Sequence, residues 1–191
     1  MYRKTTHLAV TGLFIALVLL LGLTPIGMIP LGFINVTTLC IPVIVGTLLL
    51  GLKTGMILGF AFGAVSVFKA FTATTTLVGM LMAKSPVLVI VMSIVPRLLV
   101  PVATHLTYRL IAKDQPKLKR AVPVAAVAGS LTNTVFYLGM MLLFFALCGI
   151  DAAPVLALIG GTGLIAGGCE AAVAAVLCTP ILAALWKVQK D

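Results

Sequence analysis

Arg97 is a permanent cation inside an apolar stretch, SIVPRLLVP, where Pro96 and Pro101 flank it. Its planar guanidinium carries five N–H donors, in a fork that matches the two oxygens of a carboxylate. A proline frees a backbone carbonyl and kinks a helix, and lipid tolerates such breaks where the backbone faces protein or a cavity. The residues therefore predict a pocket at Arg97 that can receive an anionic group.

Polar side chains on three consecutive apolar segments are expected at one depth. Arg97 follows Pro86 by eleven positions, which is roughly 16 Å of helix. Asn133, with its neighbour Thr132, and then Glu170 fall comparably deep in the next two segments. A charge at the centre of a bilayer costs about 2.5–3.5 kcal/mol, so such groups usually face a cavity or a partner.

Two interpretations of Arg97 follow from this placement. In the first, Arg97 forms an ion pair with Glu170, and Asn133 joins neighbouring helices through its amide. In the second, Arg97 grips an anionic group of a ligand. The two are compatible, because Glu170 can hold Arg97 while a ligand takes the remaining donors, and the sequence leaves them open.

The composition requires a membrane to position these groups. Of the 191 residues, 62% are hydrophobic and 9% are charged, whereas a soluble domain has about a quarter charged residues. A spanning helix needs about 20 mostly apolar residues. The sequence predicts an all-α integral membrane protein, one domain over residues 1–191, with six transmembrane helices in a compact bundle. The six segments are Thr6–Thr24, Val36–Leu52, Thr54–Phe71, Pro86–Lys113, Arg120–Cys148 and Pro154–Trp186.

The lysines and arginines predict the orientation of these segments, because basic residues gather on the cytoplasmic side. With both termini cytoplasmic, only Lys69 and Lys84 lie outside. The cytoplasmic set is then Arg3, Lys4, Lys53, Arg109, Lys113, Lys117, Lys119, Arg120, Lys187 and Lys190. The net charge of +9 therefore mostly reflects the orientation of the chain in the membrane. Nucleic-acid binding is not expected.

Two outer connections are distinctive. Residues 24–35 are rich in proline and glycine, and residues 71–86 are long and rich in threonine and methionine. They are either lids over a binding site or amphipathic linkers at the lipid surface. Gly160, Gly161 and Gly163 predict a break near the start of the sixth segment.

Small residues predict close helix packing. Gly55, Gly59 and Gly63 form a groove along one helix face, and Gly12 with Ala16 forms a small pair on the first segment.

The four cysteines are Cys40, Cys148, Cys169 and Cys178. No metal site or disulfide is expected, since these cysteines have no paired spacing. Neither a Walker A motif nor the common hydrolase motifs occur in the sequence, so an enzyme is not expected.

The order of these features resembles the S components of energy-coupling factor (ECF) vitamin transporters. Residues Val36–Phe68 resemble the second and third helices of that family, and Gly12 with Ala16 resembles its small-residue motif. Residues Ser93–Leu99 and Gly129–Thr134 resemble the pantothenate-type branch. The resemblance covers nearly the whole chain.

The resemblance implies a multi-pass protein of a prokaryotic cell membrane that captures a vitamin from outside, without a cofactor. A transmembrane T component, docked at Gly12 and Ala16, and two ATPase subunits would supply the energy. Pantothenate is favoured, because its carboxylate, amide and hydroxyls suit the polar residues available. Hydroxymethylpyrimidine, riboflavin and folate stay open, as does a stand-alone small carrier. The candidate ligand residues are Arg97, Asn133, Thr132, Asn35, Thr37, Ser66 and Glu170.

Overall fold

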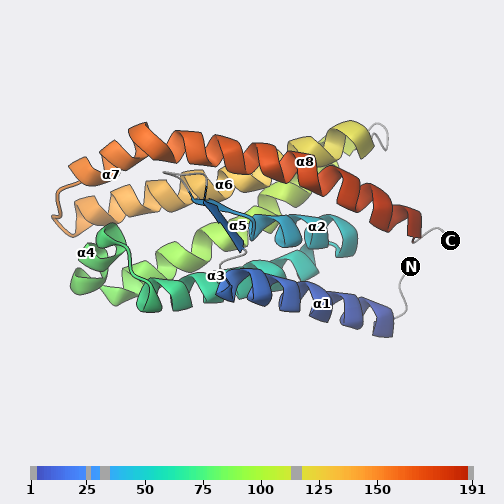
Figure 1. Ribbon diagram of the computed structural model, residues 1–191, viewed down its shortest axis with the longest axis horizontal. Coiled ribbons are helices and arrows are strands. Elements are labelled where there is room, and N and C mark those ends of the chain that lie inside the picture. Colours follow the sequence, from blue (N-terminus) through green and yellow to red (C-terminus); the bar gives the residue numbers. More distant parts are fainter. Residues whose placement is uncertain (1–3, 25–26, 31–34, 113–117, 189–191) are drawn as a thin grey trace.

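The protein is a bundle of helices with one small hairpin inserted among them (Figure 1). The computed structural model describes residues 4–24, 27–30, 35–112 and 118–188. The helices are α1 (Lys4–Leu23), α2 (Cys40–Leu50), α3 (Leu52–Thr72), α4 (Thr76–Lys84), α5 (Pro86–Ala112), α6 (Leu118–Leu147), α7 (Ala153–Leu158) and α8 (Leu164–Val188). The strands are β1 (Met28–Pro30) and β2 (Asn35–Thr37), and a π-helical turn, η2 (Ile159–Gly163), joins α7 to α8.

Five of the helices are long and apolar enough to cross a membrane, so the chain is a multi-pass membrane protein. They are α1, α3, α5, α6 and α8. The predicted second segment, Val36–Leu52, is different: it begins in β2 and continues as α2, a helix of only 11 residues. Thus the structure has five candidate spans and one short apolar helix where the sequence predicted six spans.

The short helix α2 lies at the centre of the bundle, where other helices cover it. It packs against α1, α3, α5 and α8, and Val43, Ile44 and Val45 are at most 1% exposed. A helix that is apolar on every face is stable where protein or lipid surrounds it on all sides. In α2 that surrounding is largely protein, so α2 acts as the core around which the longer helices pack.

The hairpin precedes α2 and was not predicted. The two strands are antiparallel, with Met28 opposite Thr37 and Pro30 opposite Asn35. The Thr38 N–H donates to the Gly27 carbonyl at 3.0 Å, which closes the open end of the hairpin. These bonds satisfy backbone groups that would otherwise be costly to leave unpaired inside a membrane protein.

Two predictions about the other connections can be compared with the structure. The expected outer connection over residues 71–86 contains a nine-residue helix, α4. The break predicted at Gly160, Gly161 and Gly163 is confirmed, because η2 interrupts the α-helical hydrogen bonding at Ile159–Gly163. π-helical turns of this kind are rare and are often found at functional sites.

The predicted glycine groove on α3 is confirmed as the contact with α5. A Cβ on Gly59 would lie 2.7 Å from the Arg97 carbonyl oxygen, and one on Gly63 would lie 3.2 Å from the Cα of Ile94. Pro101 explains why that carbonyl is available, because it has no N–H to donate to the residue four positions earlier. The groove therefore brings α3 against the part of α5 that carries Arg97.

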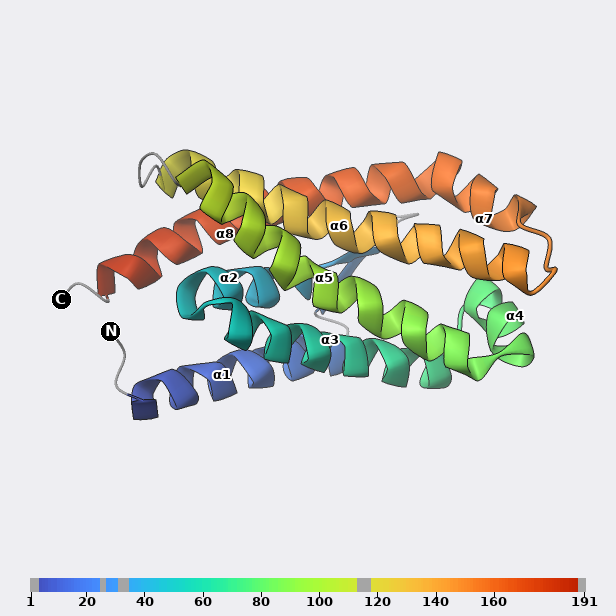
Figure 2. The ribbon, with the colours of Figure 1, turned by 180° about the vertical axis from the view of Figure 1, so that it is seen from behind.

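The two ends of the bundle are distinct (Figure 1, Figure 2). The start of α1, the end of α8 and the turn from α2 to α3 lie at one end, while α4 and α7 lie at the other. The hairpin lies between these ends, beside the middle of α8. Arg97 is near the middle of α5 and so lies between these two ends.

We predict that Gly59→Ala lowers the free energy of unfolding by about 1–3 kcal/mol, the usual cost of overpacking. The added methyl would meet backbone atoms of Arg97, which cannot move aside as a flexible side chain can. Gly139→Ala on α6 is the matched control, because no atom lies within 4 Å of its added Cβ. Denaturant titration in detergent tests this, and equal stability of the two variants would contradict it.

Candidate ligand-binding site

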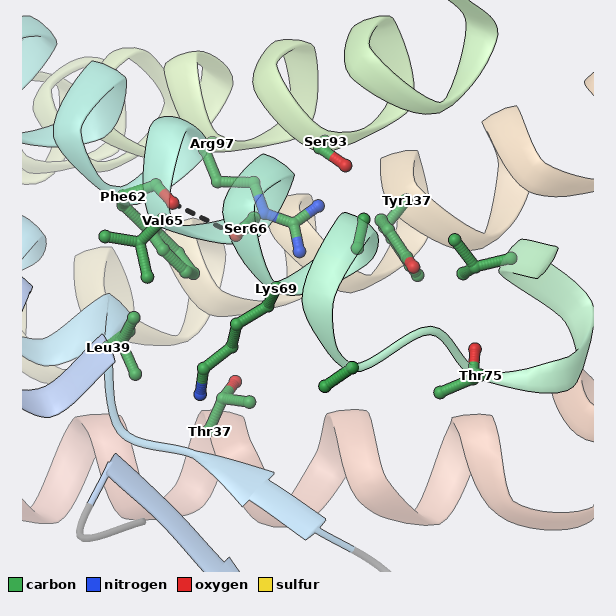
Figure 3. Close-up of a pocket in the computed structure, with 13 residues that line it drawn as sticks. Thr37, Leu39, Phe62, Val65, Ser66, Lys69, Thr75, Ser93, Arg97 and Tyr137 are labelled. Atoms are coloured by element: carbon green, nitrogen blue, oxygen red, sulfur yellow. Dashed lines mark hydrogen bonds between the residues drawn. The ribbon is translucent and has the colours of Figure 1, made fainter. Parts of the chain in front are cut away.

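A cavity of about 440 Å³ opens among α3, α5, α6, α4 and β2 (Figure 3). It contains three of the seven residues that the sequence analysis expected at a site: Arg97, Ser66 and Thr37. The other lining residues are Leu39, Phe62, Val65, Lys69, Ala70, Ala73, Thr75, Val78, Ser93 and Tyr137. Mostly apolar walls with a few polar groups are typical of small-molecule sites, whose volumes are about 300–1,000 Å³.

Arg97 is held by two aromatic rings and one backbone carbonyl. Its guanidinium carbon lies 4.6 Å from the centre of the Tyr137 ring and 5.3 Å from that of Phe62. Nη1 donates to the Met92 carbonyl at 3.4 Å, which Pro96, lacking an N–H, leaves without its helical donor. The rings stabilise the cation, and its Nε has no hydrogen-bond partner among the described residues, so it stays available to a ligand.

Arg97 has no carboxylate partner among the residues that the structure describes. Its Nε is buried without a hydrogen bond, and Figure 3 shows the guanidinium reaching into the cavity between Ser66 and Tyr137. A buried, unpaired donor of a cation costs free energy that a bound acceptor would recover. The geometry therefore favours the ligand interpretation of Arg97 over the ion pair with Glu170.

The Glu170 carboxylate forms hydrogen bonds with two threonines. Its Oε1 accepts the N–H of Thr37 at 2.9 Å and the hydroxyl of Thr37 at 2.8 Å, and Oε2 accepts the Thr134 hydroxyl at 3.5 Å. The carboxylate thereby ties the end of β2 to α8 and α6. Glu170 is thus placed directly behind Thr37, a residue of the cavity wall, and is not itself a lining residue.

The structure places the remaining predicted ligand residues in different surroundings. Asn133 is 6% exposed on α6, and its Oδ1 has no hydrogen-bond partner. The Thr132 hydroxyl donates to the Ala128 carbonyl of its own helix at 2.7 Å. Neither residue lines the cavity. The side chain of Asn35 lies outside what the structure describes.

Three important lining residues were missed by the sequence analysis. It counted Lys69 as an outer charge and did not name it as a ligand candidate, whereas Lys69 lies in the last turn of α3 and lines the cavity. Tyr137 follows Asn133 by four positions, so helical periodicity could have placed it beside the expected site. Phe62 had no distinguishing signal among the many apolar residues of α3.

Gly12 and Ala16 lie on an exposed face of α1, away from the cavity. Both are exposed, and an added Cβ on Gly12 would meet no atom within 4 Å. Neighbouring side chains are also exposed, with Leu8 at 73% and Leu13 at 69%. In a membrane protein this face contacts either lipid or another helix.

The fold and the cavity together define a multi-pass membrane protein with a cavity of the size that small-molecule sites have. The chain matches the family model for the substrate-specific component of ECF transporters over residues 6–182, and it belongs to that family. It is also 28% identical to the pantothenic acid transporter PanT of Lactococcus lactis subsp. cremoris (strain MG1363). That alignment spans 200 positions, 98% of this chain and 97% of PanT. The family is one of transporter components that bind substrate, and not of enzymes.

We predict that Glu170→Ala raises the hydrogen–deuterium exchange rate of the Thr37 amide by about 10-fold or more, because this N–H loses a charged acceptor. Glu170→Gln should raise it less, since an amide oxygen can still accept the bond. Asp151→Ala is the control, because Asp151 accepts a different backbone N–H, that of Ala153, at 3.0 Å. Exchange measured by mass spectrometry tests this, and an unchanged rate at Thr37 would show that Glu170 does not hold β2.

Proposed function

We propose that this chain is the S component of an ECF importer in a prokaryotic cell membrane and that its substrate is pantothenate. The observation that carries the proposal is the Arg97 guanidinium, which has no carboxylate partner and an unbonded Nε among the described residues, in a cavity with hydroxyl groups from Ser66, Ser93 and Thr37. Pantothenate has one carboxylate, which suits the guanidinium fork. Its amide and two hydroxyls suit the hydroxyl-bearing walls. The similarity to PanT supports the same substrate.

In this proposal the ligand carboxylate lies against the edge of Arg97, between the Phe62 and Tyr137 rings. The nearby rings exclude water from around the guanidinium, which strengthens its interaction with a carboxylate. Asn133, Thr132 and Asn35 stay proposed ligand residues that would have to reorient or approach on binding. Glu170 acts by positioning Thr37 in the cavity wall.

The proposal also sets the orientation and the partners. Both termini would be cytoplasmic, so the end with α4 and α7 would face outward. The bundle would be one domain that presents its vitamin to a T component and two ATPase subunits, which supply the energy. Gly12 and Ala16 would dock the T component, because small exposed residues let a second helix approach closely.

We predict that Arg97→Ala weakens pantothenate binding by about 100-fold or more, as expected for the loss of a charge-assisted bidentate contact. Isothermal titration of the purified chain against a panel of vitamins, without ATP, measures both affinity and substrate choice. Arg109→Ala, a change to an exposed arginine on the same helix, is the control and should bind normally. Unchanged affinity in a folded Arg97→Ala protein would contradict the proposed role of Arg97.

The same panel addresses the other candidate functions. Tight binding of hydroxymethylpyrimidine, riboflavin or folate instead of pantothenate would change the substrate while keeping the family. Flux of pantothenate into liposomes that contain this chain alone would favour a stand-alone carrier.

We predict that Gly12→Trp or Ala16→Trp prevents assembly with the T component while leaving pantothenate affinity within about twofold of wild type, because neither position is near the cavity. Val176→Trp is a matched control, since Val176 is 69% exposed on α8. Co-purification after co-expression tests assembly. Normal assembly of the Gly12→Trp and Ala16→Trp proteins would refute docking at this pair.

A further inference from the structure

Lys69 is a second cation in the cavity. It lies in the last turn of α3, is half-buried and lines the cavity together with Arg97. Figure 3 shows its side chain extending toward Thr37, on the hairpin side of the cavity. No hydrogen bond or ion pair joins its ammonium to any residue within the described ranges. The group is therefore placed at the cavity, and its three donors have no partner among the described residues.

A cation near the C-terminus of a helix is stabilised by the helix dipole, and this effect alone could explain a lysine at position 69. Lys84 provides a comparison, because it lies in the last turn of α4. Lys84 is exposed and does not line the cavity. The dipole therefore accounts for a lysine at each helix end, but not for the direction of Lys69 into the cavity.

The two cations reach different walls of the cavity. Arg97 extends from α5 toward Ser66 and Tyr137, whereas Lys69 extends from α3 toward Thr37 (Figure 3). The described lining residues include no aspartate or glutamate. The nearest carboxylate to Thr37 is that of Glu170, which lies behind the wall and accepts the Thr37 hydroxyl at 2.8 Å. The cavity is thus positively charged at two separated points.

We propose that Lys69 is a ligand-binding residue that holds the end of the substrate opposite to the carboxylate at Arg97. This inference rests on the proposed function. An ammonium group donates to hydroxyl and carbonyl oxygens, which occupy the end of pantothenate away from its carboxylate. Lys69 would then make the site selective for an anion with an oxygen-rich tail, and would disfavour a cationic vitamin.

The test compares pantothenate with panthenol, in which a neutral hydroxymethyl group replaces the carboxylate. Affinities are measured on the full chain in detergent, directly for pantothenate and by displacement for panthenol. The variants are Lys69→Met, which keeps side-chain length, Lys69→Arg, which keeps the charge, Arg97→Met, and the control Lys84→Met. Thermal melting without ligand checks that each variant is folded.

We expect Lys69→Met to weaken both ligands by the same factor, about 10- to 100-fold, because its contact is with the shared end. Lys69→Arg should retain more affinity than Lys69→Met. Arg97→Met should remove the preference for pantothenate over panthenol, and Lys84→Met should match wild type.

Two results would overturn the assignment of Lys69 alone. In one, Lys69→Met binds both ligands as Lys84→Met does. In the other, Lys69→Met loses affinity for pantothenate but not for panthenol, which would place Lys69 at the carboxylate. Failure of the wild-type chain to bind pantothenate would instead overturn the proposed function, and this inference with it.

Discussion

The Arg97 guanidinium is kept inside an apolar bundle by groups that stabilise its charge without using all of its donors. Phe62 and Tyr137 lie over it at 5.3 and 4.6 Å, and the Met92 carbonyl accepts one N–H. A carboxylate partner would have neutralised the cation and occupied its edge. Because the rings stabilise the charge instead, Nε is left without a hydrogen-bond partner among the described residues, and the architecture around the guanidinium can be understood as support for this arrangement.

Helix packing and the hairpin provide that support in two ways. The glycine groove of α3 admits the backbone of α5 at Arg97, so α3 can contribute Phe62, Ser66 and Lys69 to the same cavity. Glu170 binds the end of β2 through Thr37, and within the described residues no ion pair joins it to Arg97. The two charges that the sequence places at one depth thus serve different purposes: one organises the wall, and the other faces the cavity.

Much of this organisation could be predicted from the sequence because membrane burial makes charges and glycines informative. Arg97, Ser66 and Thr37 do meet at one cavity, the groove of α3 packs on α5, and the helix breaks at Gly160–Gly163. The hairpin and α4 were not predicted, since short elements depend on tertiary contacts more than on local pattern. Lys69 was not named as a site residue because a lysine near a helix end is usually a surface charge, and only the folded structure shows which way its side chain points.

The most direct test of the account is a structure of the chain with pantothenate bound. We predict that the carboxylate oxygens lie about 2.7–2.9 Å from the Arg97 nitrogens, at the edge of the guanidinium between the Phe62 and Tyr137 rings. A bound ligand whose carboxylate lies elsewhere, with the edge of Arg97 unoccupied or paired with Glu170, would contradict it.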